Sequence, residues 1–240
     1  MTLEVRLFPC LTDNYGILVR DRNTGVVATV DTPDADSILA DLERSGWGRL
    51  DLILNTHWHP DHTQGNARLK AMTDCEIVGP DEVRKAAPID RIVAGGDIVM
   101  LGGTALEVTD APGHTLGHIV YRSPGDAQAF VGDVLFTLGC GRLFEGTPAQ
   151  MWNSLSILAA WPDETVVWCA HEYTAANARF ALSLDDRPEM AARAAVILAM
   201  RERGHPTVPT TIGAEKAFNP FLRAGDAEAF AAVRAAKDVF

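Results

Sequence analysis

The chain has 240 residues, of which 47% are hydrophobic, so it can bury a sizeable core as one or two domains. Its 21 basic and 32 acidic residues give a formal net charge of −11, which argues against general affinity for nucleic acids or anionic membranes. The four cysteines form no CxxC pair, and no apolar stretch has the length of a secretory leader or membrane span, which predicts a soluble cytoplasmic protein.

The first two-thirds of the chain alternates short apolar runs with turn residues. Two early runs, Val26–Asp31 and Asp51–Asn55, are predicted strands. Between them, apolar residues recur at helical spacing from Ile38 to Leu42, and Gly46 favours a helix end. Six later runs also have the character of strands: Cys75–Val78, Ile98–Leu101, Ala105–Thr109, His118–Tyr121, Ala129–Val131 and Thr165–Cys169.

The last third of the chain has a helical texture. Thr147, followed by Pro148 and by Gln150, forms a capping box with proline at the first helical position. Beyond about residue 174, Ala-rich helical stretches dominate, notably Glu189–Arg203 and Asp226–Asp238. The sequence therefore predicts a β-rich body followed by a helical segment.

A dense group of potential metal ligands follows the predicted strand Asp51–Asn55. His57, His59, Asp61 and His62 lie within six residues of one another. Neutral imidazole and carboxylate suit Zn²⁺ or Fe²⁺ and do not select one of them sharply. A polar loop with adjacent histidines is the alternative interpretation, and it is weakened by further potential ligands later in the chain.

Three of those later ligands also stand where predicted strands end. His114 follows Ala105–Thr109, Asp133 follows Ala129–Val131, and His171 follows the last predicted strand. Each alone would more often be a structural residue, and a Gly-Asp pair is most often a turn. Their joint placement at strand ends favours convergence on one edge of a β scaffold.

The order of these residues resembles that of the metallo-β-lactamase superfamily: THxHxDH, then a histidine in GHT, an aspartate in GD and a late strand-end histidine. This resemblance implies an α/β (α+β) fold, a four-layer αββα sandwich, with a catalytic domain over residues 1–173 and a helical substrate-binding subdomain over residues 174–240. It also implies two divalent metal ions, zinc with iron or manganese as alternatives. The first ion would be held by His57, His59 and His114, and the second by Asp61, His62 and His171, with Asp133 bridging both.

Four further runs narrow the resemblance to one family and span nearly the whole chain. Phe8–Tyr15, Gly139–Gly146, His171–Thr174 and Asn219–Arg223 resemble segments of glyoxalase II, the hydroxyacylglutathione hydrolases. This implies hydrolysis of the thioester S-D-lactoylglutathione to glutathione and D-lactate, in methylglyoxal detoxification, by a metal-bridging hydroxide. A thiolate leaving group, with a pKa of about 8.5, needs little help from a general acid.

Catalytic and substrate-binding roles follow from the same resemblance. Asp61 and Asp133 would act in catalysis as well as in metal binding. Arg234 and Lys237 lie three apart on a predicted helix and so share one face, where a solvated basic patch is the alternative. The resemblance implies that this pair binds the glutathione carboxylates and that Arg142, Phe144 and Tyr173 supply the other contacts.

Two of these contact positions depart from the family pattern. Phe144 stands where the family often has tyrosine, so a hydroxyl contact is missing. Arg142 replaces a lysine, which keeps the charge but changes its geometry.

Three other functions compete with this interpretation. A persulfide dioxygenase of the same superfamily would use a single iron and would lack the helical appendage with its Arg-x-x-Lys pair. A general thioesterase or lactonase is the second alternative. A non-catalytic metal-stabilised binding module is the third, and the intact set of seven ligands argues against it. The expected partner is a small glutathione thioester, with no nucleic acid and no membrane, and the expected state is a monomer.

Overall fold

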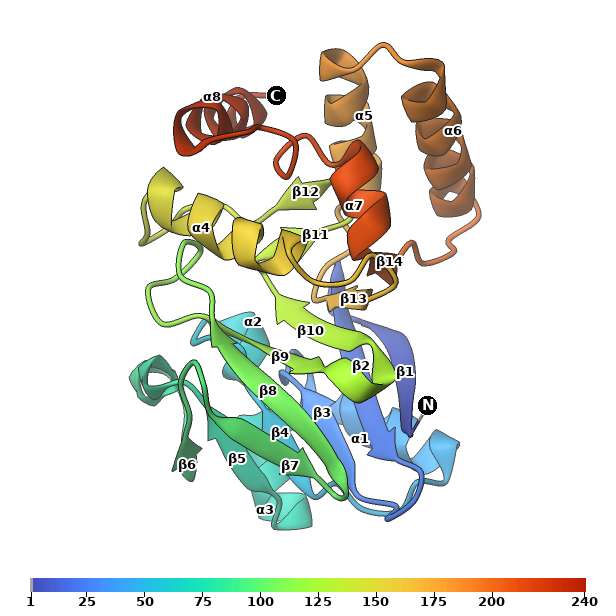
Figure 1. Cartoon of the computed structure of the whole chain (residues 1–240). Helices are drawn as coiled ribbons and strands as arrows, with labels where there is room; N and C mark the ends of the chain where they lie inside the picture. Colours follow the sequence, from blue (N-terminus) through green and yellow to red (C-terminus); the bar gives the residue numbers. More distant parts are fainter. Residues whose placement is uncertain (1) are drawn as a thin grey trace. The chain divides into compact units, whose positions relative to one another are not determined.

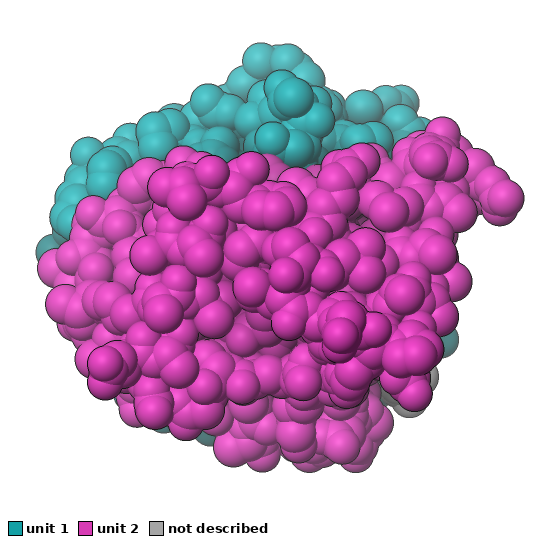
Figure 2. Space-filling model, turned by 90° about the horizontal axis from the view of Figure 1, so that it is seen from above, with its two compact units in different colours: residues 1–110, 117–132 teal, residues 111–116, 133–240 magenta. Residues whose placement is uncertain are grey.

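The computed structural model describes residues 2–240, which fold into two compact units (Figures 1 and 2). Unit 1 comprises residues 1–110 and 117–132, and unit 2 comprises residues 111–116 and 133–240. The histidine run from His57 to His62 belongs to unit 1. The later potential ligands His114, Asp133 and His171 belong to unit 2, as do all five predicted glutathione contacts.

Unit 1 contains a mixed sheet whose strands neighbour one another in chain order. The first three strands pair antiparallel and the later ones pair parallel. Parallel neighbours need crossover connections, and helices α1 (Ala35–Ser45) and α3 (Asn66–Thr73) supply two of them. The strands are β1 (Leu3–Cys10), β2 (Asn14–Asp21), β3 (Val27–Val30), β4 (Leu52–Leu54), β5 (Glu76–Gly79) and β6 (Arg91–Ile92).

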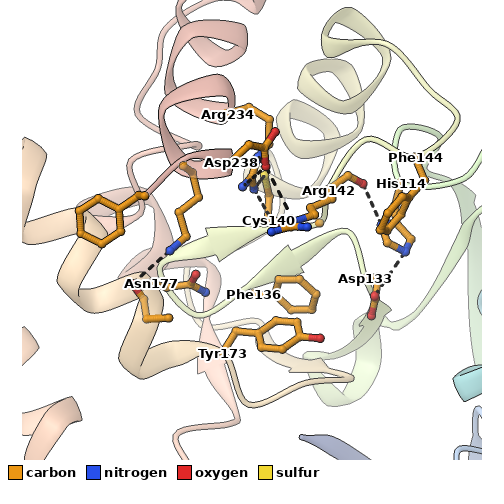
Figure 3. A pocket seen from close by; sticks show the side chains of 14 residues that line it. His114, Asp133, Phe136, Cys140, Arg142, Phe144, Tyr173, Asn177, Arg234 and Asp238 are labelled. Atoms are coloured by element: carbon orange, nitrogen blue, oxygen red, sulfur yellow. Dashed lines mark hydrogen bonds and ion pairs between the residues drawn. The ribbon is translucent and has the colours of Figure 1, made fainter.

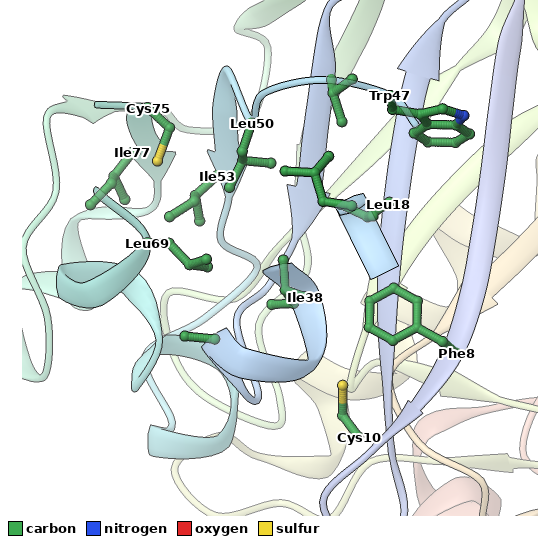
Figure 4. Close-up of a cluster of buried hydrophobic side chains, with 13 residues drawn as sticks. Phe8, Cys10, Leu18, Ile38, Trp47, Leu50, Ile53, Leu69, Cys75 and Ile77 are labelled. Atoms are coloured by element: carbon green, nitrogen blue, oxygen red, sulfur yellow. The ribbon is translucent and has the colours of Figure 1, made fainter. Parts of the chain in front are cut away.

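Helix α1 shows why the sequence forms this layer. The Asp34 carboxylate accepts a hydrogen bond from the backbone N–H of Ser37 at the helix start, and Gly46 ends the helix at φ 68°, a left-handed conformation that glycine adopts without strain. The buried face of α1, including Ile38, packs with sheet residues such as Ile53 in one apolar cluster (Figure 4). The predicted helix and its glycine stop are therefore confirmed.

A second, antiparallel group of strands completes unit 1: β7 (Ile98–Leu101), β8 (Thr104–Asp110), β9 (Ile119–Ser123) and β10 (Gln128–Gly132). Residues along β7 and β8 alternate between buried and exposed, so one face of these strands is covered. The phenol of Tyr121 on β9 donates to the carbonyl of Asn55, just after β4, which ties the two groups of strands together. The predicted α/β fold with two sheets and helices is confirmed.

Unit 2 is mainly helical. It has two short antiparallel strand pairs: the hairpin of β11 (Leu135–Phe136) with β12 (Gly139–Cys140), and β13 (Val166–Cys169) with β14 (Thr210–Thr211). Within this unit α4 packs on α8 and α5 packs on α6. The helices are α4 (Pro148–Ala159), α5 (Thr174–Leu184), α6 (Pro188–Glu202), α7 (Ile212–Phe218) and α8 (Ala227–Asp238).

The start of helix α4 in unit 2 was predicted from the sequence. The capping box at α4 is present, because Thr147 Oγ1 accepts from the backbone N–H of Gln150 and Gln150 Oε1 accepts from that of Thr147. Asp226 likewise caps α8. The strands β1 and β2 and the helices α5 and α7 were not predicted as elements. The domain boundary at residue 173 was predicted from the change from strand-like to helical sequence patterns, whereas the two compact units are defined by which residues lie close together. The boundary therefore stays a prediction.

Two further observations concern expectations made from composition. All four cysteines are free and buried, in agreement with reduced thiols. Within residues 2–240, no helix combines the length and the apolar character that crossing a membrane requires.

Candidate functional site

The histidine run of unit 1 is a loop closed by its own hydrogen bonds. After β4 the chain turns into the one-turn helix α2 (Pro60–Thr63), with proline at its first position. The Asn55 amide donates to the carbonyl of His62 at 2.9 Å, and the Thr63 hydroxyl donates to that of His59 at 3.0 Å. The spacing of the potential ligands is therefore set locally.

Hydrogen bonds at Nδ1 orient the rings of two buried histidines so that their Nε2 atoms face other potential ligands. Thr56 Oγ1 donates to Asp31 Oδ2 at 2.8 Å and so can accept from His57 Nδ1 at 3.1 Å. His62 Nδ1 donates to the same Asp31 oxygen at 2.8 Å. His57 Nε2 lies 3.0 Å from His59 Nδ1. Ring nitrogens that face one another in this way, with their other nitrogen anchored, are typical of metal ligands.

Asp31 is a further candidate residue of the site, which the sequence analysis did not predict. Its ligand oxygen and the nitrogens of His57 and His62 lie within 4.8 Å of one another, so the three form a possible metal group on their own. However, one Asp31 oxygen accepts from the Thr56 backbone N–H and the other accepts from His62 Nδ1 and the Thr56 hydroxyl. Asp31 therefore orients the ligands rather than joining them. Its position at the end of a predicted strand was the available signal.

Asp61 is fixed from a neighbouring strand. The amide of Asn14, at the start of β2, donates to Asp61 Oδ2 at 3.0 Å, and this oxygen lies 3.5 Å from His62 Nε2. Asn14 belongs to the run Phe8–Tyr15 that carried part of the family resemblance. The side chain of Asp61 is 39% exposed, whereas that of His62 is 1% exposed, so Asp61 stands at the open side of the loop.

The three later ligands converge within unit 2. Asp133 Oδ2 lies 3.4 Å from His114 Nε2, and Asp133 Oδ1 lies 3.4 Å from His171 Nε2. All three residues are buried. The Nδ1 atom of His114 donates to the carbonyl of Arg142 at 2.8 Å, which leaves Nε2 to face the carboxylate. A carboxylate whose two oxygens face different imidazoles is suited to bridge, and these His/Asp groups are suited to divalent metal ions.

A pocket of about 460 Å³ lies in unit 2 and is lined by His114 and Asp133 (Figure 3). The structure places all five predicted glutathione contacts in its lining, although their contact with a substrate stays a prediction. The other lining side chains are aromatic or polar. The lining comprises Phe136, Cys140, Arg142, Phe144, Tyr173, Asn177, Arg234, Lys237, Asp238 and Phe240, with Gly141 and Ala176.

Aromatic rings stand beside the ligand histidines. Tyr173 stacks on His171 with ring centroids 4.8 Å apart and planes 6° apart, and its edge meets Phe136 at 5.3 Å. Phe144 meets His114 edge-on at 5.2 Å and is 63% exposed. These rings form an apolar wall next to the place where an acyl group would have to react.

The three cations of the pocket differ in how they are held. Arg234 is buried, donates to the carbonyl of Cys140 at 3.1 Å and to Asp238 at 2.8 and 3.1 Å, and lies over the ring of Phe221. The Arg142 side chain is 66% exposed, with Nε 3.9 Å from Asp238. Burial, helped by the charges of Arg234 and Arg142, lowers the pKa of Lys237.

The β11–β12 hairpin that carries much of the lining is anchored by α7 and the residue that follows it. The amide of Asn219 donates to the carbonyls of Phe136 at 3.2 Å and of Gly139 at 3.0 Å. A carboxylate oxygen of Glu215 accepts from the backbone N–H of Leu138 at 2.7 Å, and burial raises the pKa of Glu215. This explains the run Asn219–Arg223 as support for the pocket, a role that the sequence did not disclose.

The two remaining histidines are placed differently. His118 is buried and stacks on His57 with centroids 4.6 Å apart, whereas His205 is exposed. Among the described residues, neither belongs to a group of three potential ligands, and their exclusion from the metal site stays a prediction.

Comparison with known proteins places these features in a family. Residues 17–171 match the family described as Metallo-beta-lactamase superfamily, and residues 172–240 match Hydroxyacylglutathione hydrolase C-terminus. A hydroxyacylglutathione hydrolase from Maricaulis maris (strain MCS10) is 52% identical, over 99% of each chain. ETHE1 from Myxococcus xanthus has a TM-score of 0.75 at 26% identity, covering 97% of this chain and 90% of that one. TTHA1623 in a di-iron-bound form has a TM-score of 0.64 at 25% identity, covering 91% and 100%.

Proposed function

The chain belongs to the hydroxyacylglutathione hydrolase family of the metallo-β-lactamase superfamily, and we propose that it hydrolyses S-D-lactoylglutathione to glutathione and D-lactate. The observation that carries this proposal is the pocket of unit 2. It combines two potential metal ligands, His114 and Asp133, with the three cations Arg142, Arg234 and Lys237. A substrate with a reactive acyl group at one end and carboxylates at the other matches that combination.

We propose that two divalent metal ions bind, zinc with iron or manganese as alternatives. His57, His59 and His114 would hold one ion, Asp61, His62 and His171 would hold the other, and Asp133 would be shared by both. Support comes from the anchored Nδ1 atoms of His57, His62 and His114. Their Nε2 atoms face other potential ligands, namely His59, Asp61 and Asp133. The relation to a protein solved in a di-iron-bound form gives further support.

The residues of this chain then bind the substrate and move its protons. Divalent metals in such a site lower the pKa of water and polarise a carbonyl group. Asp61, oriented by Asn14, accepts a proton from the attacking water. The departing thiolate of glutathione needs little protonation at neutral pH, so no dedicated general acid is required.

Lys237 and Arg142 supply charge for the glutathione carboxylates from the partly open side of the pocket, and Arg234 adds charge from a fixed, buried position. Phe144 and Tyr173 line the path between these cations and the ligand histidines. We further propose that the enzyme acts as a monomer in the cytoplasm, in the detoxification of methylglyoxal.

An activity assay together with a metal analysis tests the function. The purified protein should consume the thioester bond of S-D-lactoylglutathione, lose this activity on chelation and regain it when Zn²⁺ is added back. Metal analysis should give two ions per chain. A single iron, with oxygen consumed in the presence of a glutathione persulfide, would instead establish the dioxygenase alternative. Turnover of small thioesters or lactones in preference to the glutathione thioester would establish a general hydrolase.

A further inference from the structure

The ammonium group of Lys237 lies against two aromatic rings. Its Nζ is 5.1 Å from the ring centroid of Phe180 and 5.2 Å from that of Phe240. The same Nζ donates to the carbonyl of Ala176, on α5, at 3.2 Å. The centroids of the two rings are themselves 5.3 Å apart, so both rings lie against one side of the cation, and the carbonyl of Ala176 adds a third contact.

These contacts hold the ammonium group of Lys237 in place but engage only part of its hydrogen-bond donors. An ammonium group has three N–H donors, and the carbonyl of Ala176 takes one of them. The rings attract the cation through their quadrupoles rather than by accepting conventional hydrogen bonds. Lys237 thus keeps donors for an incoming carboxylate, whereas the guanidinium of Arg234 already donates from all three of its nitrogens to Asp238 and Cys140.

The two rings are not equivalent. Phe180 is buried in the body of unit 2, with 1% exposure, and packs on Phe221. Phe240 is 63% exposed, lines the pocket and meets the edge of Phe180 at 5.3 Å. Its backbone N–H donates to the carbonyl of Lys237, so the ring and the lysine belong to one turn at the end of α8. Of the two rings next to the ammonium group, that of Phe240 is therefore the one that lines the pocket.

We propose that Phe240 is a substrate-positioning residue, which holds the ammonium of Lys237 in place to bind a carboxylate of the glutathione thioester. This inference rests on the proposed function. Because the ring would act through Lys237, its loss should weaken binding of the glutathione portion and leave the acyl chemistry unchanged.

The test compares four full-length, metal-loaded proteins: wild type, Phe240→Leu, Phe240→Trp and the neighbouring control Val239→Ala, whose side chain is 88% exposed. Leucine keeps an apolar cover but removes the ring face. We expect Phe240→Leu to raise KM for S-D-lactoylglutathione about three- to tenfold with kcat unchanged. Phe240→Trp and Val239→Ala should keep the wild-type KM. All four should hydrolyse the S-lactoyl thioester of N-acetylcysteamine, which lacks glutathione, at the same rate.

A double-mutant cycle with Lys237→Ala shows whether Phe240 acts through Lys237 or only as an apolar part of the pocket wall. If Phe240 acts through Lys237, adding Phe240→Leu to Lys237→Ala should change KM no further. An unchanged KM in Phe240→Leu, equal losses on both thioesters, or independent effects of the two substitutions would each overturn the proposal. Wild-type protein that fails to hydrolyse S-D-lactoylglutathione would overturn the proposed function, and with it this inference. Wild-type turnover with an unaffected Phe240→Leu variant would overturn the inference alone.

Discussion

The histidine loop of unit 1 and the pocket of unit 2 are built in contrasting ways. In the loop, four potential ligands lie within six residues, and their orientation depends on nearby hydrogen bonds, above all those to Asp31. The pocket draws its lining from the segments 114, 133–144, 173–177 and 234–240, which helix packing brings together. Two of its lining residues, Phe136 and Cys140, lie on a short hairpin held by Glu215 and Asn219.

This contrast indicates what each region tolerates. A loop that carries its own hydrogen bonds should lose metal affinity when one of its partners is changed, without loss of the fold. A pocket assembled from distant segments mixes binding with stability, because a residue such as Arg234 both lines the cavity and joins α8 to β12. Substitutions in the histidine loop should therefore change metal affinity, whereas substitutions in the pocket should change substrate binding and stability.

The largest effect is expected where a carboxylate faces two ligand histidines. Asp133→Ala should lower metal content and turnover together by more than about a hundredfold, since even the outer partners of ligands commonly change either quantity 10- to 100-fold. Metal analysis and steady-state kinetics on the same preparation check this. Unchanged turnover in this variant would rule out the bridging role.

Asp31→Asn tests whether the loop of unit 1 depends on its outer partner. Asparagine tolerates the backbone φ of 56° at this position but lacks the negative charge that His62 and Thr56 share. We expect a loss of about 10- to 100-fold in metal affinity or turnover with little change in Tm. Asp21→Asn is the matched control, a buried carboxylate of the same unit that binds the backbone N–H of Gly103, and it should lower Tm while metal binding is kept.

Two substitutions in the pocket should diverge although both residues are cations on α8. Lys237→Ala should raise KM for S-D-lactoylglutathione about ten- to a hundredfold with kcat kept, since a charge-assisted contact is worth about 1.5–3 kcal/mol. Arg234→Ala should raise KM and also lower Tm, because it leaves the carbonyl of Cys140 and the carboxylate of Asp238 without their partner. Thermal unfolding and steady-state kinetics with both thioesters, measured for each variant, test this difference. Equal effects of Lys237→Ala on the two thioesters would mean that α8 is structural only.

The smallest effect is expected in the pH dependence of KM. Burial lowers the pKa of Lys237, aided by the cations Arg234 and Arg142, and the protonated form is the one that binds a carboxylate. As pH rises through this lowered pKa the charge is lost, so KM should rise a few-fold at a lower pH than an ordinary lysine would allow. Lys237→Arg should remove this rise, because arginine stays protonated. A KM profile that is the same in both proteins would assign the pH effect to another group.

Short-range features of this protein could be predicted from the sequence because their physics is local. The helix starts at Thr147 and Asp226 depend on hydrogen bonds across three residues. The histidine run and the shared face of Arg234 and Lys237 depend on spacing alone. The ends of strands could be recognised because alternating apolar runs stop there, and this is where the sequence places the later potential ligands His114, Asp133 and His171.

Long-range features were out of reach for the same reason. The strand end at Asp31 could be recognised, but the sequence does not indicate that its carboxylate accepts a hydrogen bond from His62, 31 residues later. The approach of α8 to α5 places Lys237 against Phe180 and the carbonyl of Ala176. Arg234 of the same helix meets Cys140, 94 residues away in the chain. Partners so far apart in the chain meet only when whole elements pack, since burial of apolar faces rather than residue spacing determines which side chains come into contact.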